Sequence, residues 1–171
     1  MSVASPDNPF WRFSLAFYRA PGVADACITL QDEAGVDVNV LLFLLWNATQ
    51  RKQMSAADVQ DLDAGIGPWR KAAVIPLREI RRALKTPPPV VAPGAAEAFR
   101  TRVKAVELEA ERLQQQTLYE LAPSLRFAAA QSASDAGRAS VEAYGAIVPK
   151  PFPPAAVASI LTAFDQFSRD A

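Results

Sequence analysis

Six basic residues lie close together in segment 65–85, and they are the side chains of this chain best suited to bind an anion. They are Arg70, Lys71, Arg78, Arg81, Arg82 and Lys85, against the single acid Glu79. Arginine predominates, and its planar guanidinium can make paired hydrogen bonds to a carboxylate or phosphate. Two interpretations follow. Either the segment is a basic face that docks on an acidic protein, an anionic lipid or a phosphate backbone, or it is a solvated helix face that complements the acidic N-terminal half of its own domain.

The charge balance of the whole chain weighs against nucleic acid as the partner. Residues 1–64 hold four bases and eight acids, and the chain as a whole has 18 basic and 18 acidic residues. A chain without net charge has no global field that recruits nucleic acid or a membrane surface.

Few side chains are available for catalysis or for metal binding. The chain has no histidine, which removes histidine-based catalysis and nearly all familiar zinc sites. Asp58, Asp61 and Asp63 match no complete metal site. Cys27 falls on an apolar helical stripe, where a thiol stays protonated and inert. We therefore expect no catalytic residues, no metal and no cofactor, which favours a protein that is not an enzyme.

The elements that position these residues read as helices, and the strongest signal is the segment GVDVNVLLFLLWN at residues 35–47. Asp37 is a suitable N-cap for a helix that begins there. The segment extends to about Gln53, too long for a typical strand, and leucine outnumbers the β-branched residues. Charges at Asp37 and Arg51 leave too few apolar residues for a membrane span. We predict an all-α fold, a compact bundle around this central buried helix.

Asn39 is the one polar residue near the start of that apolar helix. A buried amide needs hydrogen-bond partners, so Asn39 either ties adjacent helices together or faces a pocket. In the second case Trp46, Trp69 and the arginines would help it to hold an anionic small molecule.

Helix-capping and turn signals divide the rest of residues 7–85. Asp7 or Asn8 caps a first helix that reaches about Arg19, and a second helix follows the Pro21-Gly22 turn. A short helix opened by Ser55 is expected to end at Gly65 and Gly67. The basic helix then runs from about Pro68 to Lys85, and Pro76 should kink or split it.

The remaining chain predicts an extended linker at 86–94 and a long helix at about 95–121. Six residues of that helix recur at nearly coiled-coil spacing: Phe99, Val103, Val106, Ala110, Leu113 and Thr117. Segment 122–148 reads as a weakly packed helix or disorder. An amphipathic helix at 155–168 either folds back on its own domain or binds another protein. We thus expect a helical domain at 7–121 and an Ala/Ser/Pro-rich extension at 122–171.

Three segments carry a resemblance to a known family. They are FWRFSLAFYRAPGVADACITLQDEAGVDVNVLLFLLW from Phe10, WRKAAVIPLREIRRALK from Trp69 and VKAVELEAERLQQ from Val103. Over about residues 10–115 the chain resembles an uncharacterised family of small proteobacterial proteins, a domain of unknown function. The resemblance implies a bacterial, cytoplasmic, helical protein and brings no catalytic residues.

These observations favour a non-enzymatic cytoplasmic protein that acts through protein–protein contacts or self-association. A start without the features of a signal peptide, and a lone cysteine, fit a reducing compartment. The alternatives are a bundle that binds an anionic small molecule, with or without enzymatic activity, and a protein that binds nucleic acid or an anionic surface through the basic helix 68–85.

Overall fold

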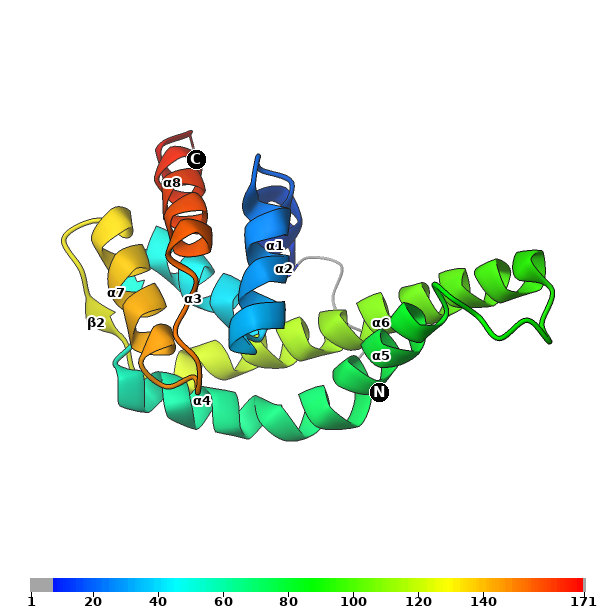
Figure 1. The fold of residues 1–171 in the computed structure, drawn as a ribbon. Coiled ribbons are helices and arrows are strands. Elements are labelled where there is room, and N and C mark those ends of the chain that lie inside the picture. The colour runs from blue at the N-terminus through cyan, green and yellow to red at the C-terminus, as the bar shows by residue number, and fades with distance from the viewer. Residues whose placement is uncertain (1–7, 171) are drawn as a thin grey trace.

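The computed structural model describes residues 8–170, which form helices and one very small sheet (Figure 1). The first helices are α1 (Pro9–Tyr18), α2 (Val23–Ala34) and α3 (Val38–Thr49). Asn8 caps α1, since its side-chain oxygen accepts a hydrogen bond from the Trp11 amide at 3.1 Å. Asp7, the alternative cap, lies outside the described residues. The predicted all-α class is confirmed.

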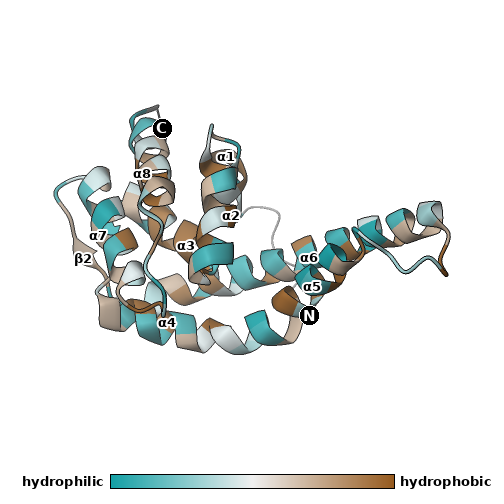
Figure 2. Ribbon diagram, viewed as in Figure 1, coloured by the Kyte–Doolittle hydropathy of each residue, from teal (hydrophilic) through white to brown (hydrophobic). Residues whose placement is uncertain are grey.

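Helix α3 lies at the centre of the core, as the sequence predicts. Every residue from Asn39 to Leu45 is buried. Asp37 caps the helix, because its Oδ1 accepts hydrogen bonds from the amides of Asn39 at 2.9 Å and Val40 at 3.4 Å. The rings of Phe10 and Phe43 pack edge to face, with centroids 5.4 Å apart. Figure 2 shows the hydrophobic residues gathered on α1 and α3.

One long curved helical run follows where two helices were expected. It consists of α4 (Ala56–Trp69), a π-helical turn η1 (Arg70–Val74) and α5 (Ile75–Ala83). The predicted stop at Gly65 and Gly67 is wrong. Among the described glycines only Gly22 and Gly35 have the left-handed backbone that ends a helix. Gly65 and Gly67 stay helical while their buried neighbour Ile66 continues the apolar face.

Pro76 explains the π turn. The sequence predicts that this proline kinks or splits the helix, and the helix widens into η1 just before it. Proline has no N–H to donate, and its ring crowds the carbonyl one turn earlier. The helix responds by widening. The amide of Ile75 bonds to the carbonyl of Arg70, five residues back, before regular geometry resumes.

Helix α6 (Pro93–Leu121) returns antiparallel to α5 and is the longest helix of the described chain. It begins two residues before the predicted start, because Pro93 fits the first position of a helix. We call α5, the connection 84–92 and α6 the hairpin. Figure 1 shows its closed end projecting well beyond the other helices.

The C-terminal segment is closely packed against the bundle rather than weakly packed or disordered. A 3₁₀ turn η2 (Ala122–Ser124) leads to β2 (Ala128–Ala129), which pairs antiparallel with β1 (Lys52–Gln53). Helix α7 (Ala133–Gly145) then packs on α3, and α8 (Pro154–Asp170) packs on α2 and α7. Of the two alternatives for the terminal helix, the structure shows the one that folds back on its own chain.

Residue Gly137 allows α7 and α8 to approach closely. A Cβ atom at this position would lie 2.8 Å from the ring of Phe164, which is itself fully buried.

No helix within the described residues combines the length and the apolar character that crossing a bilayer requires.

Candidate functional site

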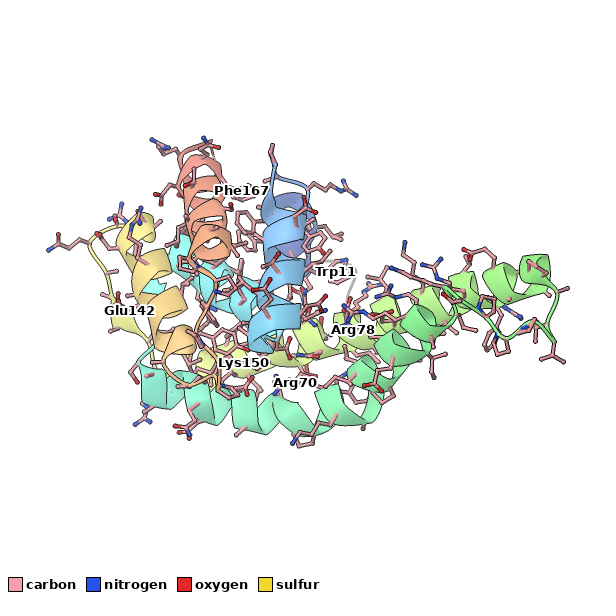
Figure 3. All side chains as sticks on the ribbon, in the orientation of Figure 1. Trp11, Arg70, Arg78, Glu142, Lys150 and Phe167 are labelled. Atoms are coloured by element: carbon pink, nitrogen blue, oxygen red, sulfur yellow. The ribbon has the colours of Figure 1, made fainter. Side chains whose placement is uncertain are left out.

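Arg70, the first of the predicted anion-binding residues, already holds two carboxylates of its own chain. Its guanidinium donates to Asp37 Oδ2 at 2.8 Å and to the two oxygens of Asp63 at 2.7 and 3.1 Å. Burial by itself would lower the pKa of this guanidinium, and the hydrogen bonds to Asp63 and Asp37 raise the pKa overall. Figure 3 shows Arg70 between the long curved helix and the bundle.

Asp37 is the centre of a partly buried polar network that we call the hub: Asp37, Asp63, Arg70, Gln114 and Tyr144. Gln114 donates to Asp37 Oδ2 at 2.6 Å. The Tyr144 hydroxyl accepts from the backbone amide of Asp37 at 2.9 Å and lies 3.5 Å from Asp63 Oδ1. Burial raises the pKa of Tyr144, and the nearby carboxylates add to this effect. The hub thereby joins α3, α4, η1, α6 and α7.

Three further arginines of the basic segment also pair with acids of the same chain. Arg78 contacts Glu107 at 3.3 Å and Glu111 at 2.9 Å. Arg81 makes a paired contact with Glu107, and Arg82 contacts Asp32 at 2.7 Å. The hydrogen bond to Glu107 raises the pKa of Arg81. Figure 3 shows Arg78 on the side of the hairpin toward Trp11 of α1.

Arginines of the basic segment therefore pair with acids of their own domain. Four arginines meet five carboxylates, of which Glu107 and Glu111 come from α6 rather than from the acidic N-terminal half. Lys71 and Lys85 are exposed, and within the described residues no ion pair involves them. Sequence reasoning missed Glu107 and Glu111 as partners because arginines and acids are 26 to 33 residues apart.

A cleft of about 300 Å³ lies beside these ion pairs. It is bounded by the end of α2, the start of α3 and the η1–α5 run, and its charged lining residues are Asp32, Asp37, Arg70, Arg78, Glu79 and Arg82. Three bases and three acids line it equally, so the cleft offers no net positive charge to an anion.

Asn39, Trp46 and Trp69 do not meet in this cleft. Asn39 is buried, and its side-chain oxygen accepts from Gln115 at 2.8 Å, which ties α3 to α6. Trp46 lies among aromatic rings, and its ring is tilted against that of Phe10 with the centroids 5.5 Å apart. The Trp69 ring N–H donates to the carbonyl of Ala110 at 3.0 Å, and much of its side chain is exposed.

The expected candidates for reactive chemistry have structural roles here. Cys27 is fully buried, and burial raises the pKa of its thiol to about 12. Ser55 caps α4 by accepting a hydrogen bond from the backbone amide of Asp58, and the side chain of Asp58 pairs with Arg126 at 2.9 Å. Asp63 belongs to the hub. In the part of the chain that the structure describes, no group of acids or cysteine is arranged to hold a metal ion.

Of the six residues of the predicted coiled-coil seam, two are buried and four, including Thr117, are exposed. Val103 and Ala110 are buried, whereas Phe99, Val106 and Leu113 are 48, 50 and 43% exposed. The seam splits because Val103 and Ala110 lie on the flank of α6 that Trp69 and the rest of the curved helix cover.

Comparison with known proteins gives one match. A family model, described as a protein of unknown function (DUF2390), matches residues 9–118, well over half of the chain. The chain belongs to the DUF2390 family. No curated protein and no solved structure matches it.

The DUF2390 segment ends within α6, so the hub contains residues from inside this segment and one residue from beyond its end. Asp37, Asp63, Arg70 and Gln114 lie inside the matched residues, whereas Tyr144 comes from α7, beyond them. The exposed residues Phe99, Val106 and Leu113 also lie inside the DUF2390 segment.

Proposed function

We propose that this protein works through protein–protein contacts made by one side of the hairpin. The observation that carries the proposal is the row of large apolar side chains, Phe99, Val106 and Leu113, each about half exposed on α6. Isolated exposed apolar residues are ordinary, but several large ones aligned on one side of a helix indicate a contact surface. We further propose that the protein works in the cytoplasm, where a lone buried cysteine remains reduced.

The orientation of this row supports the proposal. Successive residues of a helix are rotated by about 100°, so Leu113 points roughly 200° away from Gln115. Gln115 contacts Asn39 of the central helix. Leu113, and with it Val106 and Phe99 at intervals of seven residues, therefore points away from the bundle.

Two side chains of the curved helix extend the row. Ile80 is exposed and lies two residues after Arg78, whose side chain points to Glu107 and Glu111 on the inner side. By the same rotation Ile80 points outward. Trp69 lies against Ala110 of α6 and is 38% exposed. We call Trp69, Ile80, Phe99, Val106 and Leu113 the outer face.

The alternative of an anionic ligand rests on the cleft lined by Arg70, Arg78 and Arg82. Each of these arginines already has a carboxylate partner within 2.9 Å. A ligand would have to displace that partner and leave a carboxylate unpaired, at a cost of several kcal/mol where the pair is buried. The same pairing weighs against nucleic acid or an anionic surface on helix 68–85.

Photo-crosslinking tests the contact surface directly. A photoreactive phenylalanine analogue at position 106, introduced in the cells that carry the gene, should give discrete crosslinked protein products. The matched control places the same analogue at Glu142, which is exposed on α7. If position 106 gives no more product than position 142, the proposed function is wrong.

A further inference from the structure

The outer face has a pattern that is symmetric about its own centre. Val106 lies at the middle of the α6 row, with Phe99 seven residues before it and Leu113 seven residues after it. Spacing by seven keeps side chains on one straight contact line when two helices pair. A row with this symmetry fits a copy of itself running in the opposite direction, with Val106 facing Val106 and Phe99 facing Leu113.

The charges beside the row have the opposite signs that such pairing needs. Arg102 and Glu109 are both exposed and lie on the same flank of the row, toward solvent. They are four residues before and three residues after Val106. In an antiparallel pair, the positions of Arg102 of one copy and Glu109 of the other differ by only about 1.5 Å along the helix axis. Because a two-fold axis repeats each contact, this ion pair forms twice.

Arg102 is already oriented toward this surface. Its guanidinium carbon lies 5.6 Å from the centre of the Phe99 ring, within cation–π range. Within the described residues no ion pair involves Glu109. Glu109 and Arg112, whose spacing suggests a pair along the helix, do not form one, and Arg112 lies over the ring of Trp11.

The other flank of the row is also self-complementary. Trp69 lies near Ala110, toward the open end of the hairpin. Ile80 lies nearer the closed end, since the carbonyl of its neighbour Arg81 accepts from Arg100. Reversal by a two-fold axis brings Trp69 of one copy to the end of the face that holds Ile80 of the other.

From these observations we propose that the partner of the outer face is a second copy of this chain. The two hairpins pair antiparallel about a two-fold axis near Val106, with Phe99 on Leu113, Trp69 beside Ile80 and Arg102 with Glu109. This inference rests on the proposed function and names its partner. The chain carries no net charge, so no long-range repulsion opposes the association of two copies.

Sedimentation of the purified full chain over a roughly hundredfold concentration range tests the association itself. We expect a reversible dimer. Val106→Glu places two carboxylates face to face at the axis and should weaken the dimer by roughly a hundredfold or more. Because Val106 is half exposed, this variant keeps its fold, which circular dichroism verifies. Glu142→Gln is the control. A chain that is monomeric throughout overturns the inference.

Charge reversal tests the antiparallel arrangement. Arg102→Glu alone, or Glu109→Arg alone, should weaken the dimer by about tenfold, because each change converts two ion pairs into two like-charge contacts. The double variant Arg102→Glu/Glu109→Arg should recover the wild-type affinity. If the double variant loses as much dimer affinity as the two single variants lose together, this arrangement is wrong.

Disulfide mapping tests the register. Under mild oxidation, a mixture of Phe99→Cys and Leu113→Cys chains should form a linked dimer. Each variant alone should not, since two copies of the same position lie about 21 Å apart along the helix axis. Linkage by Phe99→Cys alone would show parallel pairing and overturn the inference. Cys27 is buried and stays unreactive.

These outcomes separate the two proposals. If the pure chain is monomeric and position 106 crosslinks only to another protein in cells, the second copy is wrong and the contact function stands. If the chain is monomeric and position 106 gives no specific product, both proposals fail.

Discussion

The bundle and the hairpin are held together in different ways. In the bundle, the rings of Phe10, Phe17, Phe43 and Phe164 are fully enclosed. In helix α5, whose residues are all described, no side chain is fully buried. Its arginines instead pair with acids of α2 and α6. The bundle therefore uses its apolar surface to fold, whereas the hairpin keeps part of its apolar surface available for contact.

The largest expected effect contrasts two phenylalanines. Phe43→Ala removes a fully buried ring and should lower the free energy of unfolding by about 3–5 kcal/mol. Phe99→Ala removes a ring that is 48% exposed and should cost less than about 1 kcal/mol. Urea unfolding at low protein concentration, where copies are apart, measures both. Equal losses would show that the hairpin depends on its apolar row in the same way as the bundle.

An intermediate effect is expected at the hub, which lies between the two regions. Tyr144→Phe removes the hydroxyl that accepts from the amide of Asp37, and it leaves that buried N–H without its partner. We expect a loss of about 1–3 kcal/mol in the same unfolding measurement.

The control for the hub is Tyr119→Phe. Tyr119 is half-buried, with its ring 5.7 Å from that of Trp46, and among the described residues no hydrogen bond to its hydroxyl is found. This change should have little effect on stability. A Tyr144→Phe variant as stable as the control would mean that the hub does not couple bundle and hairpin.

The smallest expected effect concerns the pH dependence of the hairpin. Burial raises the pKa of Glu111 above its usual value, against the opposing influence of Arg78. The folded state therefore binds more protons than the unfolded state between the two pKa values, and stability falls as pH rises through that window. Glu111→Gln should remove this contribution, which we expect to be below about 1 kcal/mol because the side chain is partly exposed.

Unfolding of wild type and Glu111→Gln from mildly acidic to neutral pH measures this difference. The matched control is Glu142→Gln on the exposed face of α7. If Glu111→Gln keeps the wild-type slope, the burial of Glu111 does not contribute to the pH dependence of the hairpin.

The sequence by itself predicts the central helix and its cap. The apolar run after Asp37 is long enough, and rich enough in leucine, that only a helix covered on all sides accommodates it. The place of Cys27 in the core follows from its position on the apolar stripe of α2 in the same way. Such features depend on neighbours a few residues apart.

Only the tertiary structure shows which acids pair with the arginines of the basic helix and which residues of the seam are buried. Arg78 finds its acids on α6, about 30 residues later, and Tyr144 reaches Asp37 across 107 residues. Such pairings depend on how helices cross. The seam residues of α6 recur with one regular spacing in the sequence, and contact with the curved helix buries Val103 and Ala110 but leaves Phe99, Val106 and Leu113 in solvent.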